Sequence, residues 1–375
     1  MKLYDTARRD IVGFDPGQVV TIYACGITPY DAEHIGHAAT YLAYDVLQRS
    51  LIDSGRKCRV VRNVTDVDDD ILKRARELGV FYLDLAAEEM ARFDANMASL
   101  NLIPVESEPR ATGAIPDILT FIERLLDQGQ AYQAAGAVYF DVSTAPGFGE
   151  LSGFDRDEML ALAAEHGGHP EDPAKHDPLD VVLWQPSAPG EPWWESRWGR
   201  GRPGWHVECA AISTRELGPT IDVHGGGRDL VFPHHECEAA QARSITGQPL
   251  ARTWMHTGLV GLGGTKMSKS LGNLVFVSDL LKEWEPAAVR VALLGHHYRG
   301  DWEWTDELLP AAVERLARWR AQGEGDGALD AARHALDTDL DAPAALDAMD
   351  DAVTHGQGVS AALELLGVPQ NRPVA

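Results

Sequence analysis

The sequence of 375 residues contains 45% hydrophobic and 24% charged residues, a composition typical of a globular protein of two or three domains. Its formal net charge of −24 comes from 57 acidic residues against 33 Lys and Arg, which disfavours extended contact with nucleic acid, although a local basic groove is compatible with such a charge. There is no signal-peptide pattern and no run of about 18 apolar residues, and the four cysteines (Cys25, Cys58, Cys209 and Cys237) are too scattered for a disulfide framework. We therefore expect a cytoplasmic protein without a membrane partner. A monomer is expected as well, although the sequence leaves the oligomeric state open.

The N-terminal part of the chain predicts a βαβ unit. Residues 18–24 have the composition of a buried strand, and residues 38–53 that of a helix. Residues 57–64 predict a second buried strand, which an acidic turn at 66–70 follows. Strand, crossover helix and strand form the unit of a parallel sheet. No G-x-G-x-x-G motif follows the first strand, so the ordinary dinucleotide fingerprint is absent.

A long insertion is predicted after this unit, over residues 112–200. It contains a predicted helix, a short strand and a Gly/Pro/His-rich stretch, at 115–128, 137–142 and 165–178. The sheet is predicted to resume at 220–224 and near 254–260, and the pattern beyond Val275 is helical.

Two short segments carry side chains suited to binding the phosphates of ATP. His34 and His37 lie in the turn between the first strand and its helix, where the helix dipole favours anions. Lys266 and Lys269 lie in a Gly-rich loop after a late strand, where two cations can hold the β- and γ-phosphates while the α-phosphate is attacked. Each segment alone has an ordinary alternative, an exposed histidine pair or a solvated lysine loop. Both segments together, in this order, favour nucleotide activation.

A run of three glycines at 225–227 is followed by Asp229. Glycines allow the backbone to approach an adenosine closely, and the carboxylate is then free for the ribose hydroxyls. The same run, taken alone, is also typical of a turn at the end of a strand.

Four residues suit a metal site. Cys25 ends the first strand, Cys209 lies in the segment WHVEC, and His234 opens a helix on which Glu238 lies four residues later, on the same face. Two thiolates, an imidazole and a carboxylate fit tetrahedral zinc. No C-x-x-C spacing supports the site, and a lone cysteine is commonly a small buried hydrophobic residue. The position of Cys25 nine residues before His34, at the sheet edge where substrate must lie, favours one zinc ion per chain.

The chain resembles class I aminoacyl-tRNA synthetases of the cysteinyl type and, more closely, their shortened relatives, the cysteine ligases of mycothiol biosynthesis. The resemblance runs from Leu3 to about Gly367, in the blocks CGITPYDAEHIGHAATYL, NVTDVDD, DPLDVVLW, GRPGWHVECAAI, GGGRDLVFPHHE and KMSKSLGN. It implies an α/β fold, with a Rossmann-type parallel-sheet catalytic domain, an inserted connective domain and a C-terminal α-helical region. The corresponding boundaries are 1–111 and 201–275 for the two catalytic halves, 112–200 for the insertion and 276–375 for the helical region.

Three features favour the ligases over the tRNA enzymes. The segment after Cys25 lacks the Pro that the tRNA enzymes usually have at the third position, and EHGGHP at 165–170 is similar to the E-R-G-G-D-P insertion motif of the ligases at four of six positions. The segment 323–375 is short and acidic, with ten Asp and Glu against two Arg, so it is unsuited to binding the anticodon of a tRNA. His224 and Glu238 instead match the tRNA enzymes, which leaves open whether the protein supplies three or four zinc ligands.

The resemblance implies ATP-dependent ligation of L-cysteine to the amine of glucosaminyl-inositol. A cysteinyl-adenylate would form with release of diphosphate, and attack of the amine would then release AMP. The implied cofactor is Zn²⁺, with ATP as a substrate accompanied by Mg²⁺, and tRNA is not an expected partner. Two alternatives stay open, a truncated cysteinyl-tRNA synthetase and a non-catalytic binding paralogue, of which the intact histidine and lysine segments argue against the second.

The resemblance also assigns site residues. The catalytic residues would be His34, His37, Lys266 and Lys269. The cysteinyl-adenylate pocket would be lined by Cys25, Gly26, Ile27, Thr28, Thr40, Asn63, Val64, Thr65, Trp205, Gly227, Arg228, Asp229 and Val260. The zinc ligands would be Cys25, Cys209 and His234, with Glu238 as a candidate fourth. A polar floor near the substrate thiol would consist of His206, His224 and His235, which structural histidines would resemble in sequence.

Overall fold

A four-stranded parallel sheet lies at the centre of the protein. The computed structural model describes residues 1–30, 33–267 and 272–369, without the side chain of Lys266. The sheet contains β3 (Val19–Ile27), β4 (Lys57–Val64), β9 (Ile221–Gly227) and β10 (Ala251–Thr257) in the order β10-β9-β3-β4, and each neighbouring pair is parallel. The predicted Rossmann-type parallel sheet is therefore confirmed, although β3 extends past the predicted end at residue 24, as far as Ile27.

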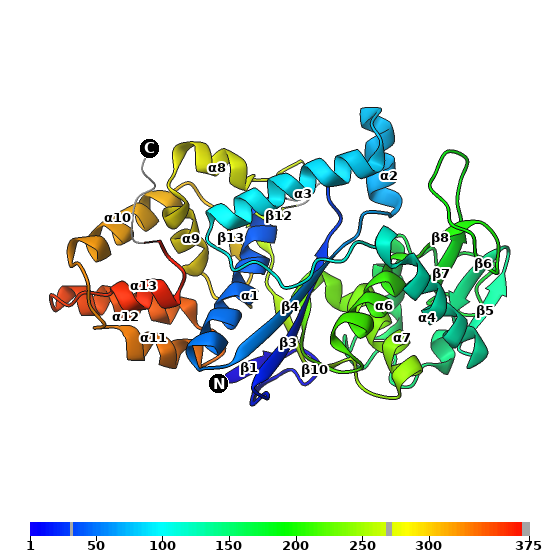
Figure 1. Cartoon of the computed structure of the whole chain (residues 1–375), viewed down its shortest axis with the longest axis horizontal. Coiled ribbons are helices and arrows are strands. Elements are labelled where there is room, and N and C mark those ends of the chain that lie inside the picture. The colour runs from blue at the N-terminus through cyan, green and yellow to red at the C-terminus, as the bar shows by residue number, and fades with distance from the viewer. Residues whose placement is uncertain (31–32, 268–271, 370–375) are drawn as a thin grey trace.

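The side chains of β3 alternate between the two faces of this sheet, as the two-residue period of a strand requires. Val20 and Ile22 belong to a core that also contains side chains of α1 (Ile35–Asp53) and of the C-terminal helices. Tyr23 and Cys25 belong to a second core with α6 (Trp205–Leu217) and α7 (Glu236–Thr246). Figure 1 shows these helices on opposite sides of the sheet. Both faces are thus covered, which explains the continuous apolar runs of the strands.

The helices that follow β3 and β4 differ in part from the sequence prediction. Helix α1 begins at Ile35, before the predicted start at residue 38, because the ring of His34 caps it by accepting a hydrogen bond from the amide of Gly36. Helices α2 (Asp69–Leu78) and α3 (Tyr82–Ser99) were not predicted. The signals for α2 are nevertheless present in the sequence, since Asp68 caps its start and Gly79 ends it in the left-handed conformation.

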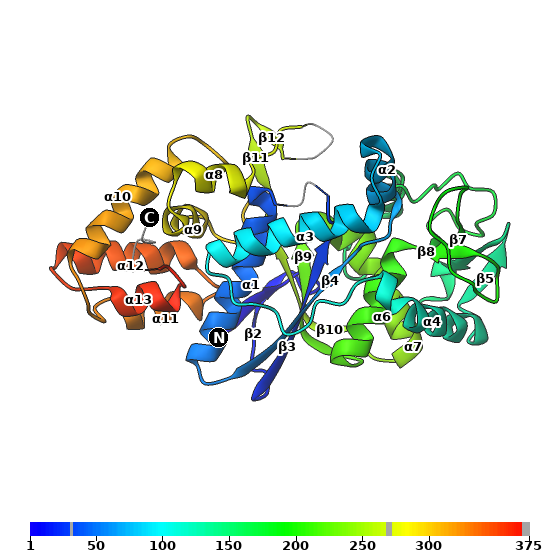
Figure 2. The same ribbon diagram turned by 45° about the horizontal axis from the view of Figure 1, so that its top comes forward.

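The insertion forms a small antiparallel sheet with helices beside it. Its strands are β5 (Ala131–Ala134), β6 (Ala137–Phe140), β7 (Val181–Pro186) and β8 (Gly201–Pro203), in the order β5-β6-β7-β8. Because β8 pairs with β7, this sheet extends past residue 200, where the insertion was predicted to end. Its helices are α4 (Ile115–Asp127) and α5 (Arg156–Glu165), with short turns η1 (Thr112–Ala114) and η2 (Val142–Thr144). Figure 2 shows the insertion at one end of the molecule and the C-terminal helices at the other. The predicted helix at 115–128 and strand at 137–142 are confirmed to within two residues.

The remaining elements are an N-terminal hairpin, a second small sheet and the C-terminal helices. Strands β1 (Lys2–Asp5) and β2 (Asp10–Gly13) form an N-terminal hairpin, and β11 (Val260–Leu262), β12 (Thr265–Lys266) and β13 (Trp302–Glu303) form a three-stranded sheet. The C-terminal helices are α8 (Val277–Glu283), α9 (Pro286–Leu294), α10 (Leu308–Ala321), α11 (Leu329–Leu336), α12 (Ala342–Thr354) and α13 (Ser360–Leu365). None of the helices within the described ranges combines the length and hydropathy that a membrane span requires.

Candidate active site

The carboxyl ends of β3 and β4 bring together two of the predicted pocket segments. Asn63 accepts a hydrogen bond from the Gly26 amide at 2.7 Å and donates one to the hydroxyl of Thr65 at 3.1 Å. The two strands are so close here that a Cβ on Gly26 would lie 1.5 Å from the carbonyl oxygen of Asn63. Glycine is therefore required at this position by packing. Ile27, Val64 and Thr65 are buried beside this contact.

Thr28 lies one residue beyond β3 and contacts a carboxylate that the sequence did not single out. Its hydroxyl donates a hydrogen bond to Oδ2 of Asp68 at 2.9 Å, while Oδ1 accepts the amide of Ile71 at 2.9 Å. Burial raises the pKa of Asp68 to about 6. The acidic turn after β4 was recognised in the sequence, but only the packing of β3 against β4 shows which of its acids reaches the predicted pocket.

The glycines at the end of β9 also permit close packing. A Cβ on Gly225 would lie 1.7 Å from the carbonyl oxygen of Met255, and one on Gly226 would lie 2.8 Å from the side chain of Leu230. After Gly227 the chain turns through η3 (Arg228–Leu230), which carries Arg228 and Asp229, and η4 (Val231–His235), which leads into α7. The run of glycines therefore brings β9 close to β10 and to the turn that carries the predicted adenosine contacts.

Two further predicted pocket residues lie near these strand ends. The hydroxyls of Thr40, on α1, and Thr257, at the end of β10, are 2.9 Å apart. Val260 is buried in β11, where it pairs with Trp302 of β13. Arg228 forms an ion pair with Asp301, which also accepts the amide of Leu259 at 2.8 Å. These contacts join the predicted pocket to the segment that precedes β13.

The predicted phosphate-binding histidines lie together at the N-terminus of α1. The ring centroids of His34 and His37 are 3.9 Å apart, at the positive end of a 19-residue helix. The segment after the lysine loop is joined to this helix start, because the amide of Ile35 donates to the carbonyl of Val275 at 2.8 Å. The backbone of Lys266 pairs with β11, whereas its side chain and Lys269 lie outside the described residues.

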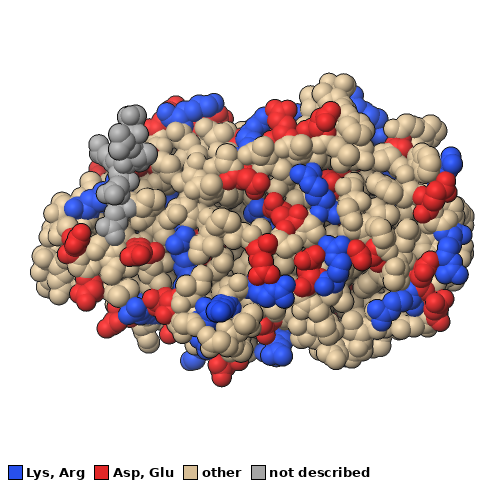
Figure 3. All heavy atoms as spheres, in the orientation of Figure 1, with Lys and Arg blue, Asp and Glu red and all other residues tan. Residues whose placement is uncertain are grey.

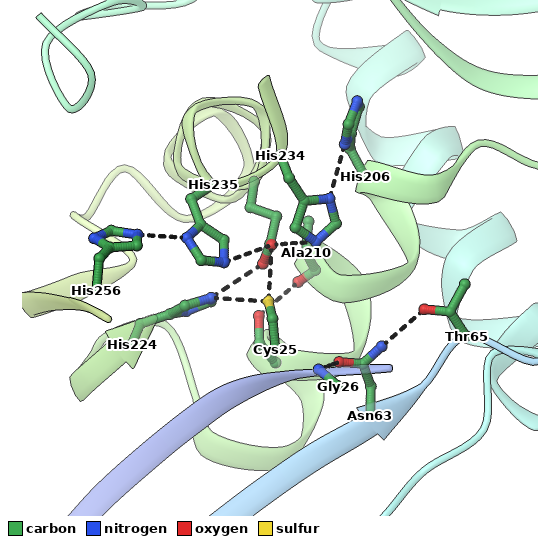
Figure 4. A network of polar contacts seen from close by, with 12 residues as sticks. Cys25, Gly26, Asn63, Thr65, His206, Ala210, His224, His234, His235 and His256 are labelled. Atoms are coloured by element: carbon green, nitrogen blue, oxygen red, sulfur yellow. Dashed lines mark hydrogen bonds and ion pairs between the residues drawn. The ribbon is translucent and has the colours of Figure 1, made fainter. Parts of the chain in front are cut away.

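Three of the four predicted metal ligands, Cys25, His234 and Glu238, converge in the core beneath the end of β3, where Figure 4 shows Cys25 and His234. Candidate ligand atoms of Cys25, His234, His235 and Glu238 all lie within 4.8 Å of one another, and all four residues are buried. Oε1 of Glu238 is 2.8 Å from Nε2 of His234 and 3.3 Å from Sγ of Cys25. This cluster could hold a metal ion. His235 was expected only in the polar floor, and sequence spacing gave no signal that its ring joins the cluster.

Cys209 lies beside this cluster, and its thiol forms hydrogen bonds with Cys25 and His234. Burial would raise the pKa of Cys209, but those hydrogen bonds and the charge of His234 outweigh it and lower the pKa to about 7. Burial would likewise raise the pKa of Glu238, but His234 and His224 lower it well below its usual range. The cluster therefore favours an ionised carboxylate and a readily ionised thiol, both of which are suitable metal donors.

Aromatic and imidazole rings form the wall beside these ligands. The ring of Trp205, the first residue of α6, stacks on His234 with centroids 4.2 Å apart. Nδ1 of His206 is 2.8 Å from Nδ1 of His234, and burial lowers the pKa of His206 well below its usual value. His224 lies 3.3 Å from Glu238 on the opposite side. The three floor histidines are therefore all close to the candidate metal ligands.

A cavity of about 590 Å³ lies away from this cluster, at the amino ends of β9 and β10. Its lining includes Asp5, Asp222, Arg243 and Arg252, and none of the predicted site residues. In an open parallel sheet, ligands bind beyond the carboxyl ends of the strands. The predicted residues lie at those carboxyl ends, which we take as the candidate active site on the basis of its chemistry.

Comparisons with known proteins agree with this geometry. Residues 14–314 match the family model described as tRNA synthetases class I (C) catalytic domain. Mycobacterium tuberculosis methionyl-tRNA synthetase in complex with methionyl-adenylate has a similar fold, with a TM-score of 0.66, 18% identity, and coverage of 90% of this chain and 82% of that one. The LeuRS–tRNA–LeuAMS complex of Agrobacterium radiobacter K84 gives a TM-score of 0.60 at 13% identity, over 96% and 85% of the two chains. The fold is that of a class I synthetase.

Curated relatives are much closer in sequence. A protein of Streptomyces griseus is 52% identical over 93% of this chain and 88% of its own length. Proteins of Thermomonospora curvata and Acidothermus cellulolyticus are 51% and 50% identical, over 93% and 94% of this chain and 86% and 89% of their own lengths. All three are named L-cysteine:1D-myo-inositol 2-amino-2-deoxy-alpha-D-glucopyranoside ligase. The chain belongs to this ligase family, within the class I synthetase fold.

Proposed function

We propose that the protein activates L-cysteine with ATP and joins it to the amine of glucosaminyl-inositol. The cysteine carboxylate attacks the α-phosphorus of ATP, and the bond to the β-phosphate breaks with release of diphosphate. The amine nitrogen then attacks the carbonyl carbon of the cysteinyl-adenylate, the bond to phosphate breaks, and AMP leaves while the amine proton passes to solvent. The observation that carries this proposal is the buried thiol, imidazole and carboxylate cluster at the glycine-rich sheet edge of a chain that is 52% identical to a named ligase.

In this proposal, the chain's own residues bind and orient ATP. His34 and His37 contact the phosphates from the start of α1, and the lysines predicted from the sequence, Lys266 and Lys269, hold the same phosphates. These positive groups stabilise the charge that develops as diphosphate leaves, which is mainly a matter of positioning and electrostatics. The backbone at Gly26 and Gly227 lies against the adenylate, with Asp229 available for the ribose hydroxyls.

The metal in the proposal is zinc, held by Cys25, Cys209 and His234 with Glu238 as the candidate fourth ligand. The donor set fits, since thiolate, imidazole and carboxylate are the usual zinc ligands and all four residues are buried. With Cys25, Cys209 and His234 as its protein ligands, a bound zinc ion would offer its fourth position to the substrate thiolate, which the hydroxyl of serine fills far less well. Trp205 and the floor histidines exclude water around that position.

The proposed acceptor is a small amine, because the C-terminal helices are poorly suited to RNA. Their arginines are already paired with carboxylates: Arg315 with Asp347 and Asp350 at 2.6 Å, and Arg333 with Asp53 at 2.8 Å. On the face shown in Figure 3, Lys and Arg lie interspersed with Asp and Glu rather than in a continuous stripe. A protein that grips RNA needs several free cations to contact phosphates.

The proposal is tested by incubating the purified protein with ATP, cysteine and either glucosaminyl-inositol or tRNA. We expect AMP release and a new amide, seen by mass spectrometry, with the aminosugar, and no stimulation by tRNA. Diphosphate exchange should proceed with cysteine and ATP alone, and poorly with serine. Charging of tRNA with cysteine would instead support the truncated synthetase, and the absence of any exchange would support a binding paralogue. Sedimentation of the same sample tests the monomer expected from the sequence.

A further inference from the structure

The buried carboxylate of Glu33 lies directly before His34, the first of the predicted phosphate-binding histidines. Its side chain is 4% exposed, and it accepts hydrogen bonds from two helices that are distant from it in the sequence. The side-chain amide of Asn96, in the last turn of α3, donates to Oε2, and the hydroxyl of Ser278, in the first turn of α8, donates to Oε1 at 2.8 Å. Figures 1 and 2 both show α3 and α8 beside α1. One carboxylate therefore joins three segments of the chain.

The backbone around Glu33 is held to one of these helices as well. Residues 33–35 pair with residues 275–277, which follow the predicted lysine loop, in a short antiparallel ladder. In this ladder the carbonyl of Glu33 accepts the amide of Val277 at 3.0 Å, and His34 forms an antiparallel bridge with Phe276. The starts of α1 and α8 are thus joined by one ladder, and the Glu33 carboxylate extends that connection to α3.

Packing alone does not require a carboxylate at this position. Taking a carboxylate out of water is costly, and an apolar side chain of similar volume often fills such a place without loss of stability. Burial accordingly raises the pKa of Glu33, although the hydroxyl of Ser278 and the charge of Arg92 oppose that shift. A carboxylate differs from an apolar side chain because each of its oxygens can accept a directed hydrogen bond. Its contribution is therefore a fixed geometry between the segment before α1 and the two helices.

We propose that Glu33 is a positioning residue for ATP, which holds His34 and His37 at the start of α1 in the arrangement that contacts the phosphates. This inference rests on the proposed function, because it takes the two histidines as phosphate-binding residues. Glu33 is buried, whereas both histidines are partly exposed, so Glu33 acts through them. His34 is the next residue and His37 lies in the first turn of the helix, so a shift of the chain at Glu33 moves both rings.

The test compares the affinities of full-length variants for ATP and for adenosine, measured by isothermal titration calorimetry in the absence of cysteine. Adenosine has no phosphates, so the loss of a phosphate contact weakens the binding of ATP alone. Glu33→Leu removes both hydrogen-bond acceptors, and we expect it to bind ATP about 10-fold more weakly, which is equivalent to one hydrogen bond to a charged group. Its affinity for adenosine should equal that of the wild type.

The variant Glu33→Gln separates geometry from charge. Its amide oxygen can accept from Asn96 while its amide nitrogen donates to the hydroxyl of Ser278, so both connections are kept without the negative charge. We expect this variant to bind ATP as the wild type does. Ser278→Ala removes one of the two donors and should weaken ATP binding by less than Glu33→Leu does. The matched control is Asp180→Leu, because Asp180 is a buried carboxylate of the insertion that also accepts hydrogen bonds from neutral donors, and its ratio of the two affinities should not change.

Three results would overturn the proposal. Equal weakening of ATP and adenosine binding in Glu33→Leu would show a merely structural role, and wild-type ATP affinity in that variant would show no role at all. A Glu33→Gln variant as weak as Glu33→Leu would show that the charge matters rather than the geometry. Should Glu33→Leu fail to fold, unchanged ATP affinity in Ser278→Ala would decide against the proposal. A wild type that binds ATP but catalyses no cysteine-dependent diphosphate exchange would refute the proposed function, while the affinity ratios of the variants would still decide the role of Glu33.

Discussion

Replacing Gly26 by alanine should disable the active site through a single backbone contact. The added Cβ would lie 1.5 Å from the carbonyl oxygen of Asn63, whereas real Cβ contacts essentially never fall below 3.0 Å. The ends of β3 and β4 must therefore separate by about 1.5 Å, the difference between those two distances. That movement also breaks the hydrogen bond from the Gly26 amide to Oδ1 of Asn63, now 2.7 Å long.

The expected cost is larger for activity than for stability. A displacement of about 1 Å in a catalytic pocket costs roughly 100-fold in rate, so we expect cysteine-dependent diphosphate exchange to fall by about that factor. Overpacking typically costs about 1–3 kcal/mol in the free energy of unfolding, which denaturant titration measures. The control is Gly17→Ala, because the nearest atom to its added Cβ is 4.0 Å away. Folded Gly26→Ala protein with the exchange rate of the control would show that the strand ends do not form the adenylate pocket.

Three further predictions concern metal, phosphates and pH. Cys209→Ala and His234→Ala should lose most of their zinc, measured by plasma mass spectrometry. Glu238→Ala decides the number of ligands: zinc retained in this variant would mean that the protein supplies three ligands and substrate or water the fourth, and zinc lost would mean four. His37→Ala should lower the rate of diphosphate exchange by roughly 100-fold, which is the effect of losing one preorganised charge-stabilising group. An exchange rate equal to that of the wild type would show that the phosphates bind elsewhere. Because burial raises the pKa of Asp68 to about 6, its contribution to stability is present below its unfolded pKa and is lost as the pH rises through about 6. The unfolding free energy of the wild type, measured relative to that of Asp68→Asn, should therefore fall between acidic and neutral pH. A difference between the two proteins that does not change with pH would contradict the raised pKa of Asp68.

Local patterns in the sequence were sufficient for the four strands of the central sheet, for helices α1 and α4, and for the type of chemistry. The apolar runs around Val20 and Val60 predict buried strands because burial on both faces of a sheet leaves a local signature. The residue types at the strand ends, among them Cys25 and the glycines at 225–227, identify a family whose model covers residues 14–314. Helix α2 was missed although its cap residues Asp68 and Gly79 are visible, because the acidic residues at 66–70 were interpreted as a turn.

The contacts between those elements were decided by the tertiary structure alone. Gly26 must be glycine because β4 places the carbonyl of Asn63 beside it, and nothing near Gly26 in the sequence records that distance. Thr6 and His256 are separated by 250 positions, yet their side chains meet because β10 lies next to the N-terminal hairpin. Periodicity and capping act over a few residues, so the sequence reveals elements and the residue types that they carry. Which side chains face one another depends on the order β10-β9-β3-β4, and that order arises only when distant segments pack together.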